Sequence, residues 1–180
     1  MKVDEDIRFI DRFQVSTKDD LLLSELSFTV RHFLSERDSL YITEVRVEHD
    51  HPCPLIESFK FEVSNGEQTR PHSILDFILP KNLRGHRVGM FVLHKVYGYL
   101  DDKIKAVNPV VNGTLVEKDN APNRDHMYKR LIGYGLDSRA QFDVDEEGYG
   151  GFEGVFHDVG TTWEQSLNVK FLGRVPILLS

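Results

Sequence analysis

Alternating residue types run through the middle of the chain and restrict what it can fold into. Between Tyr41 and Glu48, every second residue is aromatic or β-branched, and between Ile56 and Val63 the same spacing places Phe59, Phe61 and Val63 on one face. Successive side chains of a β-strand point to opposite faces, so this spacing is typical of a strand with one buried face. We therefore expect two half-buried strands in this region.

The flanking segments extend this run of strands, with one ambiguity. Residues 7–13 and the apolar stretch 73–79 also predict strands, the second ended by Pro80, and Asn65-Gly66 predicts a turn. The stretch 21–34 fits either one face of a helix or a strand, and its Phe, Thr and Val residues favour a strand from Leu26 onward. We expect the middle of the chain to form successive antiparallel strands.

The residue pattern changes after Pro80. Apolar residues then recur at three- and four-residue spacing, which predicts an amphipathic helix over residues 85–101. The remaining expected elements are a strand over 106–116 interrupted by a turn at Asn112-Gly113, a short helix over 123–131, a loop or hairpin over 143–154 and a strand over 167–172. Together they predict an α+β fold with a mostly antiparallel central sheet flanked by helices.

Size and composition indicate one folded domain over residues 1–180. Hydrophobic residues make up 40% of the chain and charged residues 28%, as in globular proteins. The formal net charge of −7 argues against a nucleic-acid partner, because binding the phosphate backbone needs clustered Lys and Arg. An acidic N-terminus, the lack of a long apolar run and a single cysteine, Cys53, favour a cytoplasmic protein with no membrane partner. The apolar residues 175–179 leave a homodimer open.

The segment from Phe77 to Met90 holds the strongest candidate site. It combines an expected strand, a short glycine-containing loop and the start of the expected helix, and its basic residues are Lys81, Arg84 and Arg87. Glycines let backbone N–H groups approach a ligand, and the start of a helix carries partial positive charge, so this arrangement suits a phosphate group. The basic side chains can add charge-assisted hydrogen bonds. The alternative is an ordinary strand–turn–helix with a solvated basic loop.

This segment resembles motif A of the GCN5-related N-acetyltransferases (GNATs), in which Arg/Gln-x-x-Gly-x-Gly/Ala follows a strand. Arg84, Gly85 and Gly89 match the motif, whereas Arg87 stands where the central glycine usually lies. The resemblance implies that the loop amides bind the pyrophosphate of acetyl-CoA and that the preceding strand pairs with its pantetheine arm. The cofactor-binding residues that it implies are Phe77, Leu79, Arg84, Gly85, Arg87 and Gly89.

A second segment, residues 120–134, is similar to motif B of the same family, Asn…Tyr-x-x-Leu-Gly-Phe. Tyr128 falls on the tyrosine and Leu131 on the leucine, and Ile132 is one residue in excess before Gly133 and Tyr134. The resemblance covers about residues 73–135 and implies a GNAT-like fold. The family usually places one or two helices between its first two strands, where this chain favours strand.

The chemistry that the resemblance implies is transfer of an acetyl group from acetyl-CoA to an amine of a small molecule or a protein. Tyr128 is then the expected general acid at the thioester sulfur. Asp76 is the expected general base, since the apolar residues that alternate with it would raise its pKa. Glu57, Glu62 and His72 are alternatives on neighbouring strands.

Two other clusters of residues are candidates for a metal site. His49, His51 and Cys53 could bind zinc, although a solvated loop explains them as well. Residues 143–148 resemble the opening of a calcium loop, but Gly154 stands where the bidentate glutamate is needed, which favours an acidic hairpin turn.

Two alternatives to an acetyltransferase stay open. One is a member of the same fold that binds acyl-CoA without catalysis, since Arg87 replaces a glycine. The other is an unrelated β-rich binding or structural domain. A parallel pair of strands that splays apart near Leu79 and Val116, with the coenzyme between them, would argue against this last interpretation.

Overall fold

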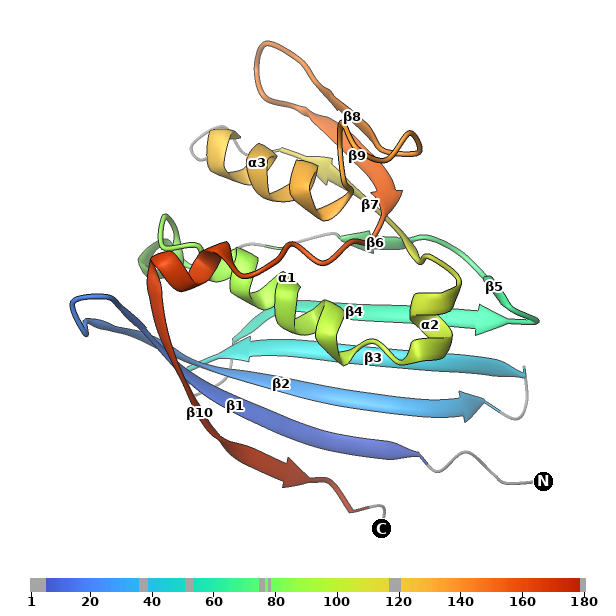
Figure 1. Cartoon of the computed structure of the whole chain (residues 1–180), viewed down its shortest axis with the longest axis horizontal. Coiled ribbons are helices and arrows are strands. Elements are labelled where there is room, and N and C mark those ends of the chain that lie inside the picture. The colour runs from blue at the N-terminus through green and yellow to red at the C-terminus, as the bar shows by residue number, and fades with distance from the viewer. Residues whose placement is uncertain are drawn as a thin grey trace.

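Two β-sheets and a few helices make up the part of the chain that the structure describes. The computed structural model describes residues 6–35, 39–50, 54–74, 77, 79–116 and 121–178. In Figure 1 a large twisted sheet lies at the bottom, helix α1 (Val88–Tyr99) crosses its upper face, and a smaller sheet with helix α3 (Ala121–Leu131) lies above. The fold is therefore α+β with mostly antiparallel strands, but its strands form two sheets rather than one central sheet.

The larger sheet has six antiparallel strands in the order β10-β1-β2-β3-β4-β5. Its strands are β1 (Ile7–Thr17), β2 (Leu22–Ser35), β3 (Leu40–His49), β4 (Leu55–Ser64), β5 (Glu67–Gln68) and β10 (Leu167–Pro176). The strands expected over 41–48 and 56–63 are confirmed, and the ambiguous stretch 21–34 is a strand from Leu22 onward. Asn65 and Gly66 form the expected turn, with φ of 52° and 79°, as a tight hairpin requires.

The smaller sheet has four strands in the order β6-β7-β9-β8, and its first pair is parallel. Its strands are β6 (His72–Ile74), β7 (Val110–Leu115), β8 (Gln141–Val144) and β9 (Gly150–Val155). Of the strand expected over 73–79, only residues 73 and 74 are described as strand, and they pair with β7. The chain thus leaves the larger sheet after β5, which corrects the expectation of one continuous antiparallel run.

The turn expected at Asn112-Gly113 is wrong, because both residues lie inside β7. Gly113 pairs with Phe152 of β9 on one side and with Ile74 of β6 on the other. A Cβ atom at Gly113 would lie 2.5 Å from Cε1 of Phe152. The glycine therefore leaves room for an aromatic ring that lies across the strand, a role that glycine often has where another group approaches closely.

The helices differ from the expected ones in number and extent. Helix α1 begins at Val88 and ends at Tyr99, inside the expected range 85–101, and α3 is close to the expected 123–131. The strand expected from residue 106 is wrong at its start, since α2 (Asp102–Ala106) precedes β7. Two 3₁₀ turns, η1 (Lys81–Leu83) and η2 (Thr162–Gln165), complete the described elements. A tight turn, not a helix, joins β1 to β2.

Aromatic residues fill the space between the larger sheet and the elements above it. The ring of Phe91 on α1 meets the rings of Phe13 and Phe28 edge to face, with centroids 5.5 and 6.1 Å apart. Beneath the smaller sheet, Phe156 stacks on Phe59 and Phe61 of β4. Burial of these rings fixes α1 and the start of the smaller sheet on the larger one. No described helix is long and apolar enough to span a bilayer.

Candidate functional site

A cavity of about 740 Å³ opens between the two sheets, at the beginning of α1. Its walls come from five places: the segment after β6, the loop before α1, the end of β7, α3, and η2. This volume is typical of small-molecule sites in proteins, which range over roughly 300–1,000 Å³. The cavity is therefore the natural candidate for a ligand site among the described residues.

Seven of the eight site residues expected from the sequence lie in the wall of this cavity. They are Phe77, Leu79, Arg84, Gly85, Arg87, Gly89 and Tyr128. The eighth, Asp76, lies outside the described residues. The two segments that carried the family resemblance, which are about 40 residues apart, thus meet across one hollow.

The loop between Pro80 and α1 takes its shape from two residues with positive φ. Gly85 has a φ of 79°, and Arg87, the residue just before α1, has a φ of 63°. Glycine adopts this left-handed conformation freely, whereas other residues with a Cβ adopt it at a cost of about 1 kcal/mol or more. Arg87 therefore keeps the backbone shape of a glycine at the position where the resembling motif usually has one.

The loop arginines hold the loop against its surroundings. Arg84 Nε donates to the carbonyl oxygen of Leu79 at 2.7 Å. Arg87 Nη1 donates to the carbonyl oxygen of Thr162 at 2.7 Å and to Oε1 of Gln165 at 2.9 Å. The two hydrogen bonds of Arg87 connect the loop before α1 to η2, which belongs to a distant part of the chain.

The parallel strands β6 and β7 lead into the cavity. Their last paired residues are Ile74 and Gly113. Beyond this pair, Phe77 and Leu79 on one side and Thr114, Leu115 and Val116 on the other all line the cavity. Residues that follow β6 and the end of β7 thus line the same cavity.

Gly89 lies where α1 approaches α3 and the segment after β6. A Cβ atom there would lie 2.7 Å from Sδ of Met127 and 3.3 Å from both Cδ1 of Leu79 and Cε1 of Phe77. The absence of a side chain at Gly89 therefore allows these three side chains to close the inner end of the cavity.

Tyr128 is a buried aromatic residue at the cavity wall. Its ring stacks on that of Phe152, with centroids 4.3 Å apart, and its exposed fraction is 6%. Burial, with a contribution from the negative charge of Glu57, raises the pKa of Tyr128 far above its ordinary value. The hydroxyl is therefore protonated at neutral pH and can serve as a proton donor.

The alternative base candidates differ in their surroundings. The pKa of Glu62 is lowered by its hydrogen bond to Lys60 and its exposed partner Arg70, and burial lowers the pKa of His72 to about 4. Both shifts weaken these groups as bases. Glu57 is 9% exposed, accepts a hydrogen bond from the N–H of Ser58, and lies close enough to Tyr128 to affect its pKa.

The charge of the cavity wall is opposite to that of the whole chain. Its described residues include four arginines and one histidine, and no aspartate or glutamate, in a protein with a net charge of −7. Such a local excess of positive charge attracts anions. The wall residues are Arg84, Arg87, Arg124, His126 and Arg130.

The sequence interpretation found Tyr128 on α3 but missed the other cavity residues of α3 and those of η2. Asn123, His126, Met127 and Arg130 recur at three- and four-residue spacing and form one stripe of α3 that faces the cavity. A stripe at this spacing is usually apolar where a helix packs on a core, so its polar character was an available signal. The approach of η2, by contrast, gave no local signal.

The competing clusters do not form a metal site among the described residues. His49 Nδ1 lies 3.3 Å from Oδ2 of Asp50, while His51 and Cys53 lie outside the described residues. No three described His, Cys, Asp or Glu side chains gather as a metal ion would require.

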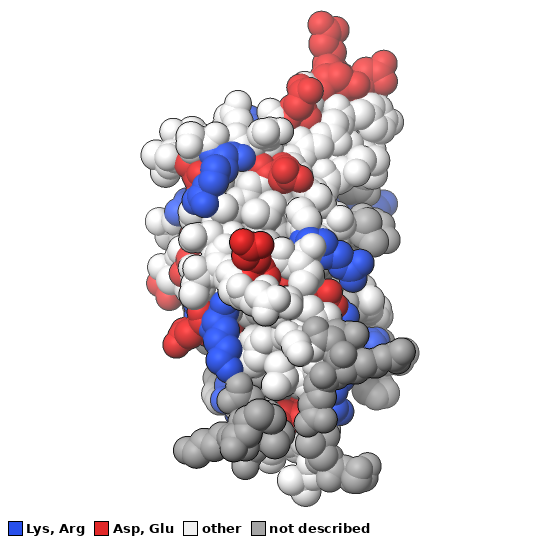
Figure 2. Space-filling model, turned by 90° about the vertical axis from the view of Figure 1, so that its right-hand side faces the viewer, with Lys and Arg blue, Asp and Glu red and all other residues white. Residues whose placement is uncertain are grey.

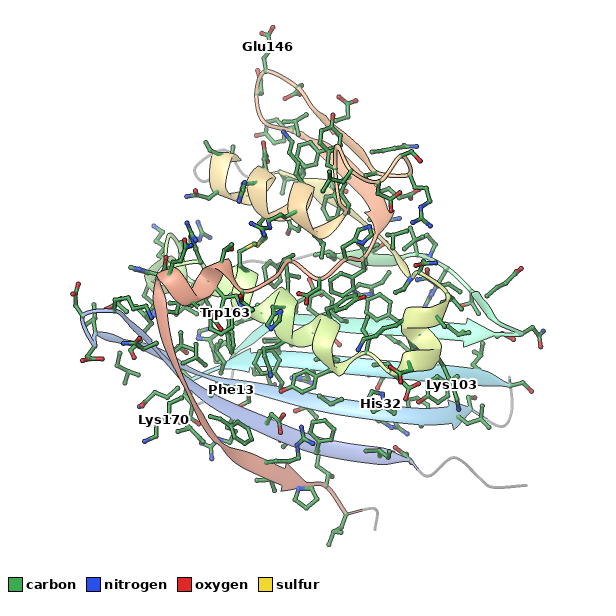
Figure 3. The ribbon with its side chains drawn as sticks, viewed as in Figure 1. Phe13, His32, Lys103, Glu146, Trp163 and Lys170 are labelled. Carbon is green, nitrogen blue, oxygen red and sulfur yellow. The ribbon has the colours of Figure 1, made fainter. Side chains whose placement is uncertain are left out.

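The acidic segment 143–148 forms the end of β8 and most of the turn that leads to β9. The Oδ1 atom of Asp145 accepts hydrogen bonds from the N–H groups of Glu147 and Tyr149. Glu146 points away from the rest of the molecule at the tip of the hairpin (Figure 3), and Figure 2 shows acidic side chains gathered at that end. This supports the hairpin interpretation over the calcium loop.

Comparisons of the chain with protein-family models, with curated proteins and with solved structures found no significant match.

Proposed function

We propose that the protein is an acyl-CoA-dependent N-acyltransferase with a GNAT-like arrangement of β6, α1, β7 and α3. The observation that carries the proposal is the cavity itself, which is bounded by residues that follow β6, by the end of its parallel neighbour β7, and by an arginine- and glycine-containing loop at the beginning of a helix. Both resembling segments contribute to its wall. An unrelated β-rich binding or structural domain would give no reason for both segments that resemble GNAT motifs to line the same cavity.

The cavity suits the chemistry of acetyl-CoA in three respects. Its volume matches a ligand of this size. The loop before α1 offers backbone N–H groups, partial positive helix charge and two arginines to a pyrophosphate. The residues Phe77, Leu79 and Leu115 offer an apolar passage to the less polar pantetheine arm.

The proposed reaction is a direct transfer. The nitrogen of the amine attacks the thioester carbonyl, so a C–N bond forms and the C–S bond breaks. Tyr128 donates its proton to the departing thiolate, and a base accepts the proton that the amine loses. The hydroxyl of Tyr128 is protonated at neutral pH, and its raised pKa makes it a weaker acid than an exposed tyrosine. Glu57 is buried and close enough to Tyr128 to affect its pKa, but it is not part of the described cavity wall, so we propose that it accepts the amine proton through a water molecule.

The part of the protein that would bind the amine acceptor differs from the corresponding part of the GNAT family. A tight turn joins β1 to β2 where that family usually has helices, and η2, followed by β10, covers a side of the cavity instead. We therefore propose only that the acceptor is an amine and that acetyl-CoA is the donor.

A non-catalytic acyl-CoA-binding protein is the second candidate. One observation favours it: the described wall of the cavity contains no carboxylate that could act as a base. Turnover of an amine by the wild-type protein would decide against it. The variant Tyr128→Phe should then bind acetyl-CoA normally but react roughly 100-fold more slowly, as is typical when a general acid is lost.

Calorimetric titration with acetyl-CoA, CoA and ADP tests the binding site. We expect micromolar affinity for acetyl-CoA and CoA and weaker binding of ADP, which lacks the pantetheine arm. Gly89→Ala should weaken binding because its Cβ meets Met127, Leu79 and Phe77. Gly98→Ala on the same helix is the matched control, since a Cβ there meets no atom within 4 Å. Equal binding by the two folded variants would refute this placement, and no binding by the wild-type protein would refute the function.

A further inference from the structure

The positive charge of the cavity wall lies in two separate groups. One group, Arg84 and Arg87, belongs to the loop before α1, and the other, His126 and Arg130, belongs to the stripe of α3 that faces the cavity. In Figure 1, α3 lies above the beginning of α1 and the 3₁₀ turn before β10. A single phosphate or pyrophosphate at the loop does not account for the second group.

The two cationic groups also differ in the hydrogen bonds that they form within the protein. Arg87 donates hydrogen bonds to Thr162 and Gln165, and Arg84 donates one to Leu79. The guanidinium of Arg130 is exposed and has no hydrogen bond or ion pair with any described residue. Its Nη2 atom lies 3.6 Å from the position that a Cβ of Gly160 would occupy. Arg130 therefore presents its donors to the mouth of the cavity, close to the segment that Arg87 also contacts.

The remaining arginine of α3 is held elsewhere. Arg124 Nε donates to Oδ1 of Asp125 at 2.8 Å, and its Nη2 donates to the carbonyl oxygen of Gly148 at 2.9 Å. These bonds tie α3 to the β8–β9 hairpin. Arg130, with His126 one turn before it on the helix, is thus the group best prepared to meet an anion from the ligand.

We propose that Arg130 on α3 forms a second anion subsite that binds the 3′-phosphate of CoA and so makes the protein discriminate CoA from 3′-dephospho-CoA. This inference rests on the proposed acyl-CoA function and deepens it. CoA has two anionic parts, a pyrophosphate and a phosphate on the ribose, which correspond in number to the two cationic groups of the wall. A planar guanidinium also suits a phosphate better than a single ammonium would.

The test is calorimetric titration of the full chain with CoA and with 3′-dephospho-CoA. We expect the wild-type protein to bind CoA about tenfold more tightly, the effect of one charge-assisted hydrogen bond. Arg130→Gln should bring the two affinities within about twofold of each other by weakening CoA alone. The matched control is Lys129→Gln, which removes the same charge one residue away, outside the cavity wall, and should keep the tenfold preference.

The possible results distinguish failure of the Arg130 subsite from failure of the proposed acyl-CoA function. Equal binding of both ligands by the wild-type protein would overturn the subsite and leave the acyl-CoA site standing. The same would follow if Arg130→Gln weakened both ligands equally, because the arginine would then act only through general charge. No binding of either ligand by folded protein would overturn the proposed function as well.

Discussion

The stability of the protein should fall as the pH drops below 6.5 because of one histidine. The ring of His72 lies 5.4 Å from that of Phe59 and 5.3 Å from that of Phe61. Its Nδ1 accepts a weak hydrogen bond of 3.4 Å from the N–H of Lys60, and its Nε2 is buried with no described partner. Burial, with a contribution from the positive charge of Arg70, lowers its pKa to about 4.

The size and sign of the effect follow from the difference between folded and unfolded pKa values. In the unfolded chain His72 binds a proton near pH 6.5, whereas in the folded protein it does so only near pH 4. The unfolded state therefore binds more protons between these values, and the free energy of unfolding falls as the pH falls. At about 1.4 kcal/mol per pH unit, the loss is about 2 kcal/mol at pH 5 and about 3 kcal/mol at pH 4.

Urea unfolding at several pH values between 7.5 and 5 measures this loss. The chain has one tryptophan, Trp163, whose ring lies 4.9 Å from that of Phe91 and points toward α1 (Figure 3), so its fluorescence reports on unfolding. His72→Phe keeps an aromatic ring but cannot titrate, and should remove most of the pH dependence. An identical pH dependence in this variant, or titration of His72 near pH 6.5 in the folded protein by NMR, would refute the reasoning.

Three further substitutions have defined outcomes. Gly113→Ala should lower the free energy of unfolding by about 1–3 kcal/mol, since its Cβ would lie 2.5 Å from the ring of Phe152; a thermal melt unchanged from wild type would contradict this. Arg174→Met should cost about 1–3 kcal/mol in urea unfolding, because Asp11, 3% exposed, loses two hydrogen bonds from the half-exposed Arg174 but keeps the one from the hydroxyl of Tyr99; adding Asp11→Asn should recover part of the loss. Arg87→Gly should be more stable than Arg87→Ala by about 1 kcal/mol, because both lose the same side-chain bonds and only alanine is strained at a φ of 63°; equal melting temperatures would argue against strain.

Local patterns predicted most of the strands because burial on one face produces alternation directly. The strands β3 and β4 fall where alternation indicated them. Asn112-Gly113 misled the prediction for a physical reason. Asn-Gly is a strong hairpin signal, and a glycine that makes room for the ring of Phe152 has the same local sequence as a glycine in a turn.

The division into two sheets depends on contacts that local patterns do not encode. The apolar run from Ser73 to Leu79 is typical of a strand buried on both faces, but its partner, β7, lies beyond two helices in the chain.

The loop before α1 and Tyr128 could be predicted as parts of the candidate site, whereas η2 could not. The loop from Arg84 to Gly89 and the tyrosine Tyr128 had recognisable patterns, and they line the same cavity. The approach of Thr162 and Gln165 to Arg87 did not, since it joins residues 75 and 78 positions apart. A contact of this kind depends on the path of the whole chain, so only the three-dimensional structure could reveal it.

The position of η2 has a consequence for how the protein matures on the ribosome. This turn closes one side of the cavity, and it is followed directly by β10, which reaches across to pair with β1 at the far edge of the larger sheet. Synthesis proceeds from the N-terminus, so β1 waits with an unpaired edge while nearly all of the described chain is made. A nascent chain that lacks residues 162–176 therefore has an open cavity and an exposed sheet edge at the same time.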